Sequence, residues 1–345
     1  MKGLRTLFSL IVLLALLTAC VPPVPTNIAP APDTAADAVF PIAIDHKYGS
    51  TTIAAQPQRI VTVGLLEQDA LLALGITPVG TTEWFGGYPG AIWPWAQDEL
   101  AALGGAVPAA VGGESINFET IAALQPDLIL ALYSGITQEQ YDLLTQIAPT
   151  VAQPADWVDY GVPWQELTRI VGKAVGKAAE AEALVAQVED RFVQLRNEHP
   201  EFVGASAAAA MAWQGIYVYG AQDARSRLLT NLGFVLPAEL DAITGSNFGG
   251  NLSLERADLL DTDVIIWIDP EDTEGELGGP VYQSLPVHTE GREVLLDSES
   301  ADGLGGATSF ITVLSLPYLL DHLTPMLAAA IDGDPATTVI ATTEK

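Results

Sequence analysis

Residues 117–130 read NFETIAALQPDLIL, and residues 253–266 read SLERADLLDTDVII. Each stretch has a Glu in third place, an apolar stripe of helical spacing after it, and an Asp eight residues beyond the Glu. Each then ends in an apolar run that suits a buried strand. Because the pattern of a helix followed by a buried strand occurs twice, the sequence predicts two similar α/β halves.

The sequence around the first stretch predicts a lobe built on parallel β-α-β units, over residues 40–163. This lobe opens with an alternating segment at 40–59 that is typical of a hairpin, with its turn at Tyr48-Gly49-Ser50. After the hairpin the predicted elements are a strand within 59–64, a helix ending at Gly75, a strand at 76–80, a helix at 118–124, a strand at 128–132, a helix at 138–146 and a strand at 150–152.

Residues 164–199 change in character and predict one long helix. Apolar residues recur there at three- and four-residue steps on one face, from Ala181 to Leu195. Lys177 to Glu198 alone would extend about 33 Å at 1.5 Å per residue. Beyond Pro200 the order of the first lobe returns, so we expect a second lobe at 200–331 and a tail at 332–345. The predicted fold class is α/β, with two lobes joined by a single helical strut.

The N-terminal residues predict export and anchoring. Lys2 and Arg5 precede an apolar stretch at 7–17, so residues 1–19 are expected to be a signal peptide. The segment Leu17-Thr18-Ala19-Cys20 resembles a bacterial lipobox, and Cys20 is the only Cys of the chain. We therefore expect Cys20 to be lipidated and to hold the protein at the outer side of the cell membrane. Residues 20–39, rich in Pro and Ala, are expected to be the tether.

Charge restricts the partners. The formal net charge is −29, and removal of Lys2 and Arg5 with the signal would make it −31. Such a chain repels phosphate backbones, which excludes nucleic acid as a partner. A site for an anionic ligand would then have to be made by a few basic side chains close together.

A series of motifs follows in a specific order and spacing: PQRIVTVG, ALLALGITPVG, NFETIAALQPDLILALYSGIT, IAPTVA, PWQELTRIVGKAVGK, RLLTNLGFVLP, SLERADLLDTDVIIWI and LSLPYLLDHLTP. Together, over about residues 40–331, they resemble the iron-siderophore substrate-binding lipoproteins of bacterial ABC importers. The resemblance implies the class III periplasmic-binding-protein fold, two Rossmann-like lobes with one interdomain helix. It also implies a monomer without cofactor or enzymatic activity, which captures a ferric siderophore and delivers it to a membrane permease.

The resemblance gives the repeated Glu a role. In that family the Glu that leads each of the two helices docks on Arg residues of the permease, and Glu119 and Glu255 match those positions. The alternative is that each carboxylate only stabilises the start of its own helix, by about 0.3–1 kcal/mol. That alternative does not explain why both recur in register with an Asp and a strand.

Ligands of open α/β sheets bind outside the carboxyl ends of strands. In the second lobe this rule points to the loop GAQDARSR at 220–227, which contains Arg225 and Arg227. A guanidinium presents a planar fork of donors that suits catecholate or hydroxamate oxygens. We therefore expect both Arg residues to bind ligand; the alternative is that they pair with Asp223.

Aromatic side chains are expected to complete the site, because their faces stack on catechol rings and on apolar or cationic ligand parts. Each is as easily explained as a core residue. The expected ligand contacts are Trp84, Tyr88, Trp93 and Tyr133 in the first lobe and Trp213, Tyr219, Trp267 and Phe310 in the second.

Other functions are less well supported by the sequence. A carrier of bare metal ions would need converging ligands, but His46, His199, His288 and His322 show no ligand spacing. Haem or a corrinoid remains an alternative ligand, with Tyr133 or Tyr219 as a haem ligand. An enzyme is not indicated, because no G-x-S-x-G, Walker, G-x-G-x-x-G or H-E-x-x-H motif occurs in a suitable context.

Overall fold

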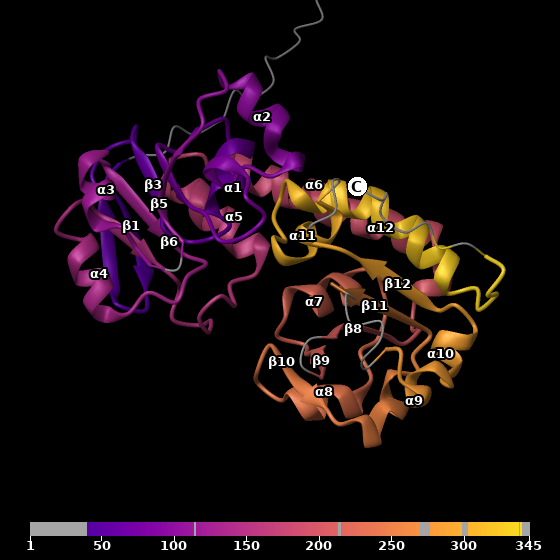
Figure 1. The fold of residues 1–345 in the computed structure, drawn as a ribbon. Coiled ribbons are helices and arrows are strands. Elements are labelled where there is room, and N and C mark those ends of the chain that lie inside the picture. The colour runs from indigo at the N-terminus through magenta and orange to yellow at the C-terminus, as the bar shows by residue number, and fades with distance from the viewer. Residues whose placement is uncertain are drawn as a thin grey trace, which may run out of the picture. The chain divides into compact units, whose positions relative to one another are not determined.

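Two five-stranded sheets, each covered by helices, organise the described part of the chain (Figure 1). The computed structural model describes residues 40–113, 115–212, 215–269, 277–298, 303–337 and 339. The predicted signal peptide, Cys20, the tether and most of the last eight residues therefore lie outside the described residues. Within those residues, every helix falls short of the length and apolar character that crossing a bilayer requires.

The first sheet is fully parallel and has the order β5-β4-β3-β6-β7. Its strands are short, and all except the edge strand β5 are buried on both faces, as expected for a parallel sheet covered by helices. The strands are β3 (Ile60–Thr62), β4 (Gly80–Thr82), β5 (Ala109–Gly112), β6 (Leu128–Ala131) and β7 (Thr150–Ala152). The helices are α1 (Glu67–Ala73), η1 (Pro89–Ala91), η2 (Pro94–Ala96), α2 (Gln97–Ala102), α3 (Phe118–Ala123) and α4 (Gln138–Leu144).

Two local predictions for this lobe need adjustment. The hairpin is confirmed, as β1 (Ile42–His46) and β2 (Gly49–Ile53) pair antiparallel, but its turn lies at Lys47 and Tyr48. The strand expected at 76–80 was placed too early. Pro78 has no amide hydrogen for a ladder, and β4 begins at Gly80, where a Cβ would meet Val111 and Leu124.

The second sheet is mixed, with the order β10-β9-β8-β11-β12. β8, β11 and β12 are parallel, whereas β9 runs antiparallel to both of its neighbours, β8 and β10. The strands are β8 (Ala207–Ala212), β9 (Ile216–Tyr219), β10 (Gly249–Leu252), β11 (Val264–Ile268) and β12 (Glu293–Leu296). The helices are η3 (Pro200–Phe202), α7 (Ala224–Asn231), α8 (Ala238–Thr244), η4 (Leu254–Leu260), α9 (Pro280–Gln283), α10 (Pro286–Thr289), α11 (Leu304–Ser309) and α12 (Ser315–Ala330).

The repeated stretch has a structural explanation for its Asp. Asp127 accepts hydrogen bonds from the amides of Gln58 and Arg59 at 2.8 and 2.9 Å, just before β3. Asp263 accepts from the amide of Ser206 at 2.7 Å, just before β8. Each Asp therefore ties the start of its own strand, β6 or β11, to the start of the neighbouring parallel strand.

Residues 164–199 form two helices instead of the single helix predicted. α5 (Trp164–Ala174) ends before Gly176, whose φ of 77° is left-handed, and α6 (Ala178–Glu198) begins just after Lys177. α5 packs on α1, so only α6 corresponds to the expected strut. The predicted apolar face of α6 is confirmed, because Ala181, Val185 and Leu195 are buried.

Contacts from the last part of the chain also join the lobes. Phe310 is buried within a cluster of first-lobe rings that includes Phe85 and Trp93. Thr312 Oγ1 donates to Asp69 of α1 at 2.6 Å. α12 then runs beside α6, where Arg191 pairs with Asp321 at 2.9 Å (Figure 1). Besides α6, a buried interface therefore holds the two lobes together.

Candidate ligand-binding site

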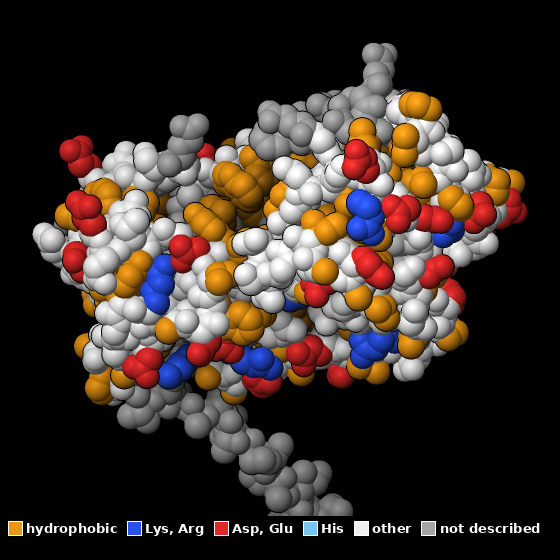
Figure 2. Space-filling model, turned by 90° about the horizontal axis from the view of Figure 1, so that it is seen from below, with side chains coloured by type: hydrophobic (Ala, Val, Ile, Leu, Met, Phe, Trp, Pro, Cys, Tyr) orange, Lys and Arg blue, Asp and Glu red, His pale blue; other side chains and the backbone are white. Residues whose placement is uncertain are grey.

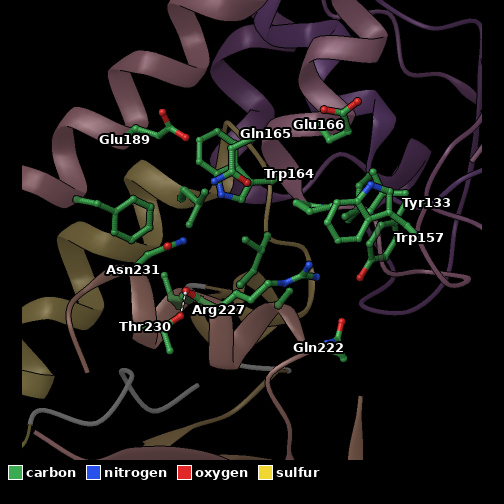
Figure 3. Close-up of a pocket in the computed structure, with 18 of the residues that line it drawn as sticks. Tyr133, Trp157, Trp164, Gln165, Glu166, Glu189, Gln222, Arg227, Thr230 and Asn231 are labelled. Atoms are coloured by element: carbon green, nitrogen blue, oxygen red, sulfur yellow. Dashed lines mark hydrogen bonds between the residues drawn. The ribbon is translucent and has the colours of Figure 1, made fainter. Parts of the chain in front are cut away.

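A cavity of about 520 Å³ is lined by residues of both lobes and of the two connecting helices (Figure 3). Leu66 and Tyr133 reach it from the carboxyl ends of β3 and β6, as the strand-end rule predicts. Residues drawn around it in Figure 3 include Tyr133, Trp157, Trp164, Gln165, Glu166, Glu189, Gln222, Arg227, Thr230 and Asn231. Figure 2 shows one face of the molecule, on which hydrophobic side chains gather in a hollow between more polar surfaces.

A second, smaller cavity of about 140 Å³ lies at the same edge of the first sheet. It is lined by residues that follow or end β3, β4, β5 and β6, among them Val63, Thr82, Gly112 and Ser134, and by Tyr160. The rings of Tyr133 and Tyr160 are in edge contact, with centroids 5.9 Å apart. Tyr133 lines the first cavity and Tyr160 the second, so this tyrosine pair stands between the two.

Glu67 fixes the loops that carry the first-lobe wall. Its Oε1 accepts from the amides of Leu132 and Tyr133 at 2.5 and 3.0 Å, and its Oε2 accepts from Leu66 at 3.1 Å. Burial raises the pKa of Glu67, and these backbone donors act in the opposite direction. A Cβ at residue 64 would overlap the carboxylate, which explains the Gly there. Sequence reasoning missed this residue, because nothing in the spacing around Glu67 indicates that its carboxylate bonds the amides of Leu132 and Tyr133.

Tyr133 is expected to present a neutral hydroxyl to a ligand. Burial raises the pKa of its phenol to about 12; Asp223 acts in the same direction, and the nearby Arg225 and Arg227 act against it. The phenol therefore stays protonated at physiological pH and can donate one hydrogen bond. Of the described aromatic residues in the predicted set, Tyr133 alone lines the larger cavity.

Arg227 lies at the cavity, and its predicted contact with a ligand stays a prediction. It lines the cavity from α7, and its Nη1 donates to the carbonyl of Gly161 in the first lobe at 3.2 Å. No carboxylate in the described part of the chain lies within ion-pair distance of it, so the alternative pairing with Asp223 is not formed. Burial lowers the pKa of this guanidinium, which nevertheless keeps its charge.

Arg225 follows the alternative instead. Its Nη1 pairs with Asp223 at 3.2 Å, and its Nη2 donates to Ser309 at 2.6 Å. The guanidinium lies over the ring of Tyr219, 4.3 Å from the ring centroid. Asp223 also caps α7 by accepting from the amide of Arg225. Arg225 is thus held by second-lobe groups and does not line the larger cavity, so its predicted role as a ligand contact remains a proposal.

The structure contradicts several expected aromatic contacts. Trp93 and Trp267 are 1 % and 0 % exposed, Phe310 is 3 % exposed, and all three belong to the core. Trp93 stacks on Trp95, and Trp267 donates its indole N–H to Tyr282 at 2.7 Å. These rings are therefore enclosed by protein, and their bulk stabilises the fold.

The other expected aromatics have mixed positions. Trp84 is 58 % exposed beside Phe85 and Phe310, and Tyr88 is half-buried against Trp93. Tyr219 is buried in the core at 7 % exposure, with the guanidinium of Arg225 over its ring, so it too is not available as the expected ligand contact. Trp213 lies outside the described residues. The structure instead adds Trp157 and Trp164, which sequence reasoning did not select.

The repeated Glu residues are both exposed, as docking requires. Glu119 lies in the first turn of α3, whose N-cap is Asn117, and Glu255 in the first turn of η4, whose N-cap is Ser253. η4 is a 3-10 helix with non-helical geometry at Arg256, so the second helix is less regular than predicted. Among the described side chains neither Glu forms an ion pair.

The histidines are dispersed. His46 bonds Thr51 and contacts Tyr141, and burial lowers its pKa. His199 pairs with Glu201, His288 pairs with Glu293, and His322 bonds the carbonyl of Tyr318. In the described ranges, no three His, Cys, Asp or Glu side chains come together in a way that could hold a metal ion.

Comparisons with known proteins agree with this architecture. Residues 60–292 match the model of the periplasmic binding protein family. A solved periplasmic solute binding protein of Mycobacterium smegmatis is 36 % identical with a TM-score of 0.74, over 84 % of this chain and 98 % of that chain. PiaA of Streptococcus pneumoniae, solved with ferrichrome, is 28 % identical with a TM-score of 0.74, over 85 % of this chain and 99 % of that chain. YhfQ of Bacillus subtilis, whose name contains the words "ABC transporter substrate-binding lipoprotein", is 28 % identical over 68 % of this chain and 73 % of that protein.

Proposed function

Because the chain belongs to the periplasmic binding protein family, we propose that it is the extracytoplasmic binding component of an ABC importer and captures a ferric siderophore between its lobes. The main observation in support of a siderophore as the ligand is the chemistry of the cavity lining. It combines an Arg without a carboxylate partner among the described residues, a neutral phenol and two indole rings. The ferrichrome bound by PiaA is a ligand of this class.

The cavity suits an oxygen-rich chelate in size and chemistry. Its volume of about 520 Å³ falls within the usual range of small-molecule sites, about 300–1,000 Å³. Arg227 and Tyr133 supply donors for chelate oxygens, and Trp157 and Trp164 supply flat apolar faces. Arg225, Trp84, Tyr88 and Tyr219 line neither this cavity nor the smaller one, so their contact with a ligand would require a ligand that extends beyond both cavities.

The finer features of transport form part of the proposal. Cys20 would carry the lipid anchor, and the protein would act as a monomer. Glu119 and Glu255 would each dock on a basic residue of the permease, one per lobe. Their exposure and their equivalent positions before β6 and β11 support this assignment.

Ligand binding can be tested by intrinsic fluorescence, since the chain has seven Trp and two of them line the cavity. Ferric siderophores of the catecholate, hydroxamate and carboxylate types are titrated separately. At least one should quench emission at submicromolar concentration. Quenching by Zn²⁺ or Mn²⁺ with no response to any chelate would favour a carrier of bare metal ions, and a response to haem or a corrinoid alone would favour that alternative.

A matched pair of variants tests the role of Arg227. Arg227→Gln should weaken binding of the responding chelate at least tenfold, because a charge-assisted hydrogen bond is lost from a part-buried site. Arg169→Gln is the control. Arg169 lines the same cavity, but its Nε and Nη2 already donate to the two carboxylate oxygens of Glu182, at 2.7 and 3.0 Å. Equal affinities of the two variants would contradict the assignment.

A further inference from the structure

We propose that the first turn of α5 forms an oxyanion subsite, in which Trp164 and Arg227 hold a carboxylate arm of the ligand. The proposal rests on the function proposed above and narrows the substrate class to chelates that bear a free or iron-bound carboxylate. None of these groups except Arg227 was singled out from the sequence. Three observations on the described residues support the subsite.

The first observation is an unsatisfied donor. Trp164 is 6 % exposed, and its Nε1 has no hydrogen-bond partner in the described part of the chain. In Figure 3 its ring lies across the cavity from Arg227, with the indole nitrogen on the cavity side. A buried donor left unpaired costs about 1–3 kcal/mol, a cost that an arriving acceptor would remove. Trp164 therefore holds an unpaired, covered donor in the cavity wall opposite Arg227.

The second observation concerns the helix start. α5 has eleven residues, and its N-cap, Pro163, makes no side-chain capping bond. The first hydrogen bond of the helix runs from Leu167 to the carbonyl of Pro163. The amides of Trp164, Gln165 and Glu166 precede that bond and so lie at the positive end of the helix dipole. Such a turn, at the wall of a cavity, favours an anion.

The third observation is the balance of charge in the cavity. Among the described residues, the guanidinium of Arg227 makes a single hydrogen bond, to the carbonyl of Gly161, which leaves the rest of its fork for a ligand. Arg169 is already occupied by Glu182. Glu189 is exposed and Glu166 is partly exposed, and Figure 3 draws both on the side opposite Arg227. Solvent screens the exposed carboxylate of Glu189 more than it screens the part-buried guanidinium of Arg227.

Trp164→Phe gives a clean test, because it removes the N–H and keeps a ring. Uniformly folded protein, checked by thermal unfolding, is titrated with ferric dicitrate, a carboxylate chelate, and with ferrichrome, a neutral hydroxamate chelate. We expect the variant to lose about tenfold or more in affinity for ferric dicitrate and much less for ferrichrome. Trp157→Phe is the comparison variant, since Trp157 also lines the cavity, and it should change the affinities for the two chelates to a similar extent.

A second readout separates this inference from the proposed function. The indole ¹H–¹⁵N resonance of Trp164 is assigned by its loss in Trp164→Phe and is followed while iron-free citrate is added at millimolar concentration. A selective shift supports the oxyanion subsite even if no ferric chelate binds, in which case the proposed function alone fails. If ferric chelates bind while Trp164→Phe keeps full affinity for ferric dicitrate and citrate leaves the resonance unmoved, the subsite is overturned and the proposed function stands.

Discussion

Glu67 and Asp69, two residues apart at the start of α1, are buried for different reasons. Glu67 faces the first-lobe loops and holds three backbone amides around Tyr133. Asp69 faces the second lobe and accepts hydrogen bonds from Trp95 at 2.8 Å and Thr312 at 2.6 Å. Neither role could be predicted from the sequence, because an acidic residue in a first turn is normally explained by the helix dipole. Their partners lie up to 243 residues away along the chain.

Replacement of Glu67 should affect both stability and the site. In Glu67→Gln an NH₂ group replaces one of the two accepting oxygens, so an amide of the site loops faces another donor. We expect a loss of about 1–3 kcal/mol in the free energy of unfolding and weaker chelate binding through displacement of Tyr133. Urea unfolding and fluorescence titration measure the two effects. Glu119→Gln, at an exposed position, should change neither; the same result for Glu67→Gln would contradict the positioning role.

Asp69 should make stability depend on pH. Burial raises its pKa from 3.8 to about 6, although the hydrogen bonds from Thr312 and Trp95 oppose the shift. The folded state then binds the proton more tightly than the unfolded state. The stabilising contribution of the protonated form is complete below about pH 4 and is lost as the pH rises through about 6.

Asp69→Asn isolates this effect, because the amide oxygen still accepts from both donors and does not titrate. Relative to the wild type, the variant should gain up to about 3 kcal/mol in unfolding free energy between pH 4 and pH 7. Urea unfolding of the two proteins at a series of pH values gives this difference directly. A difference that stays constant over that range would show that Asp69 titrates alike in the folded and unfolded chains.

At the scale of elements, periodicity located most helices and strands but not their breaks or surroundings. The apolar face of α6 and the buried strands β6 and β11 follow directly from spacing. The break at Gly176 could not be seen, because the helical pattern continues across it. Likewise, Trp93 and Trp157 both occur in loop-rich segments, and only tertiary packing places one in the core and the other at the cavity.

The crossing of α5 and α6 depends on a close approach at Gly172. A Cβ there would overlap the Cβ of Ala181 and crowd the carbonyl of Lys177. Gly172→Ala should therefore cost about 1–3 kcal/mol of unfolding free energy, as overpacking usually does. Chemical denaturation provides the value, with Gly250→Ala as control, since its nearest atom would be 3.4 Å away.

A double-mutant cycle tests the contact itself. Gly172→Ala combined with Ala181→Gly should be more stable than the sum of the two single changes predicts, because the second change makes room for the added methyl group. Additive effects would mean that Ala181 is not what opposes the methyl group.

For the whole molecule, the sequence predicted two lobes and a connection, and the structure adds the interface that unites them. Phe310 and Thr312 bring the second lobe onto first-lobe residues, alongside the strut α6. Because this interface takes up rings such as Trp93 and Phe310, fewer of the expected aromatic residues line the ligand cavity than the sequence predicted. An aromatic residue near a strand end can serve either a cleft or a lobe interface, and composition does not distinguish the two.

Transport should depend on both exposed Glu residues together. Charge reversal in Glu119→Lys and Glu255→Lys should each reduce uptake of the ferric chelate, and the double variant should abolish it. Chelate affinity should remain unchanged, because neither residue lines the cavity. Uptake of radioactive iron by cells and fluorescence titration of the purified variants provide the two measurements; a weakened affinity would contradict the docking role.

The buried contact between the lobes limits how such a protein can diversify. A hybrid that joins residues 40–199 of this chain to the second half of a relative would leave Asp69 without Thr312 and Trp93 without Phe310, unless the incoming half supplied the same groups. Exchange of halves at the connecting helices would therefore leave buried groups without their partners, as a substitution inside either core does. New ligand preferences are more easily acquired by changing cavity-lining side chains than by exchanging halves.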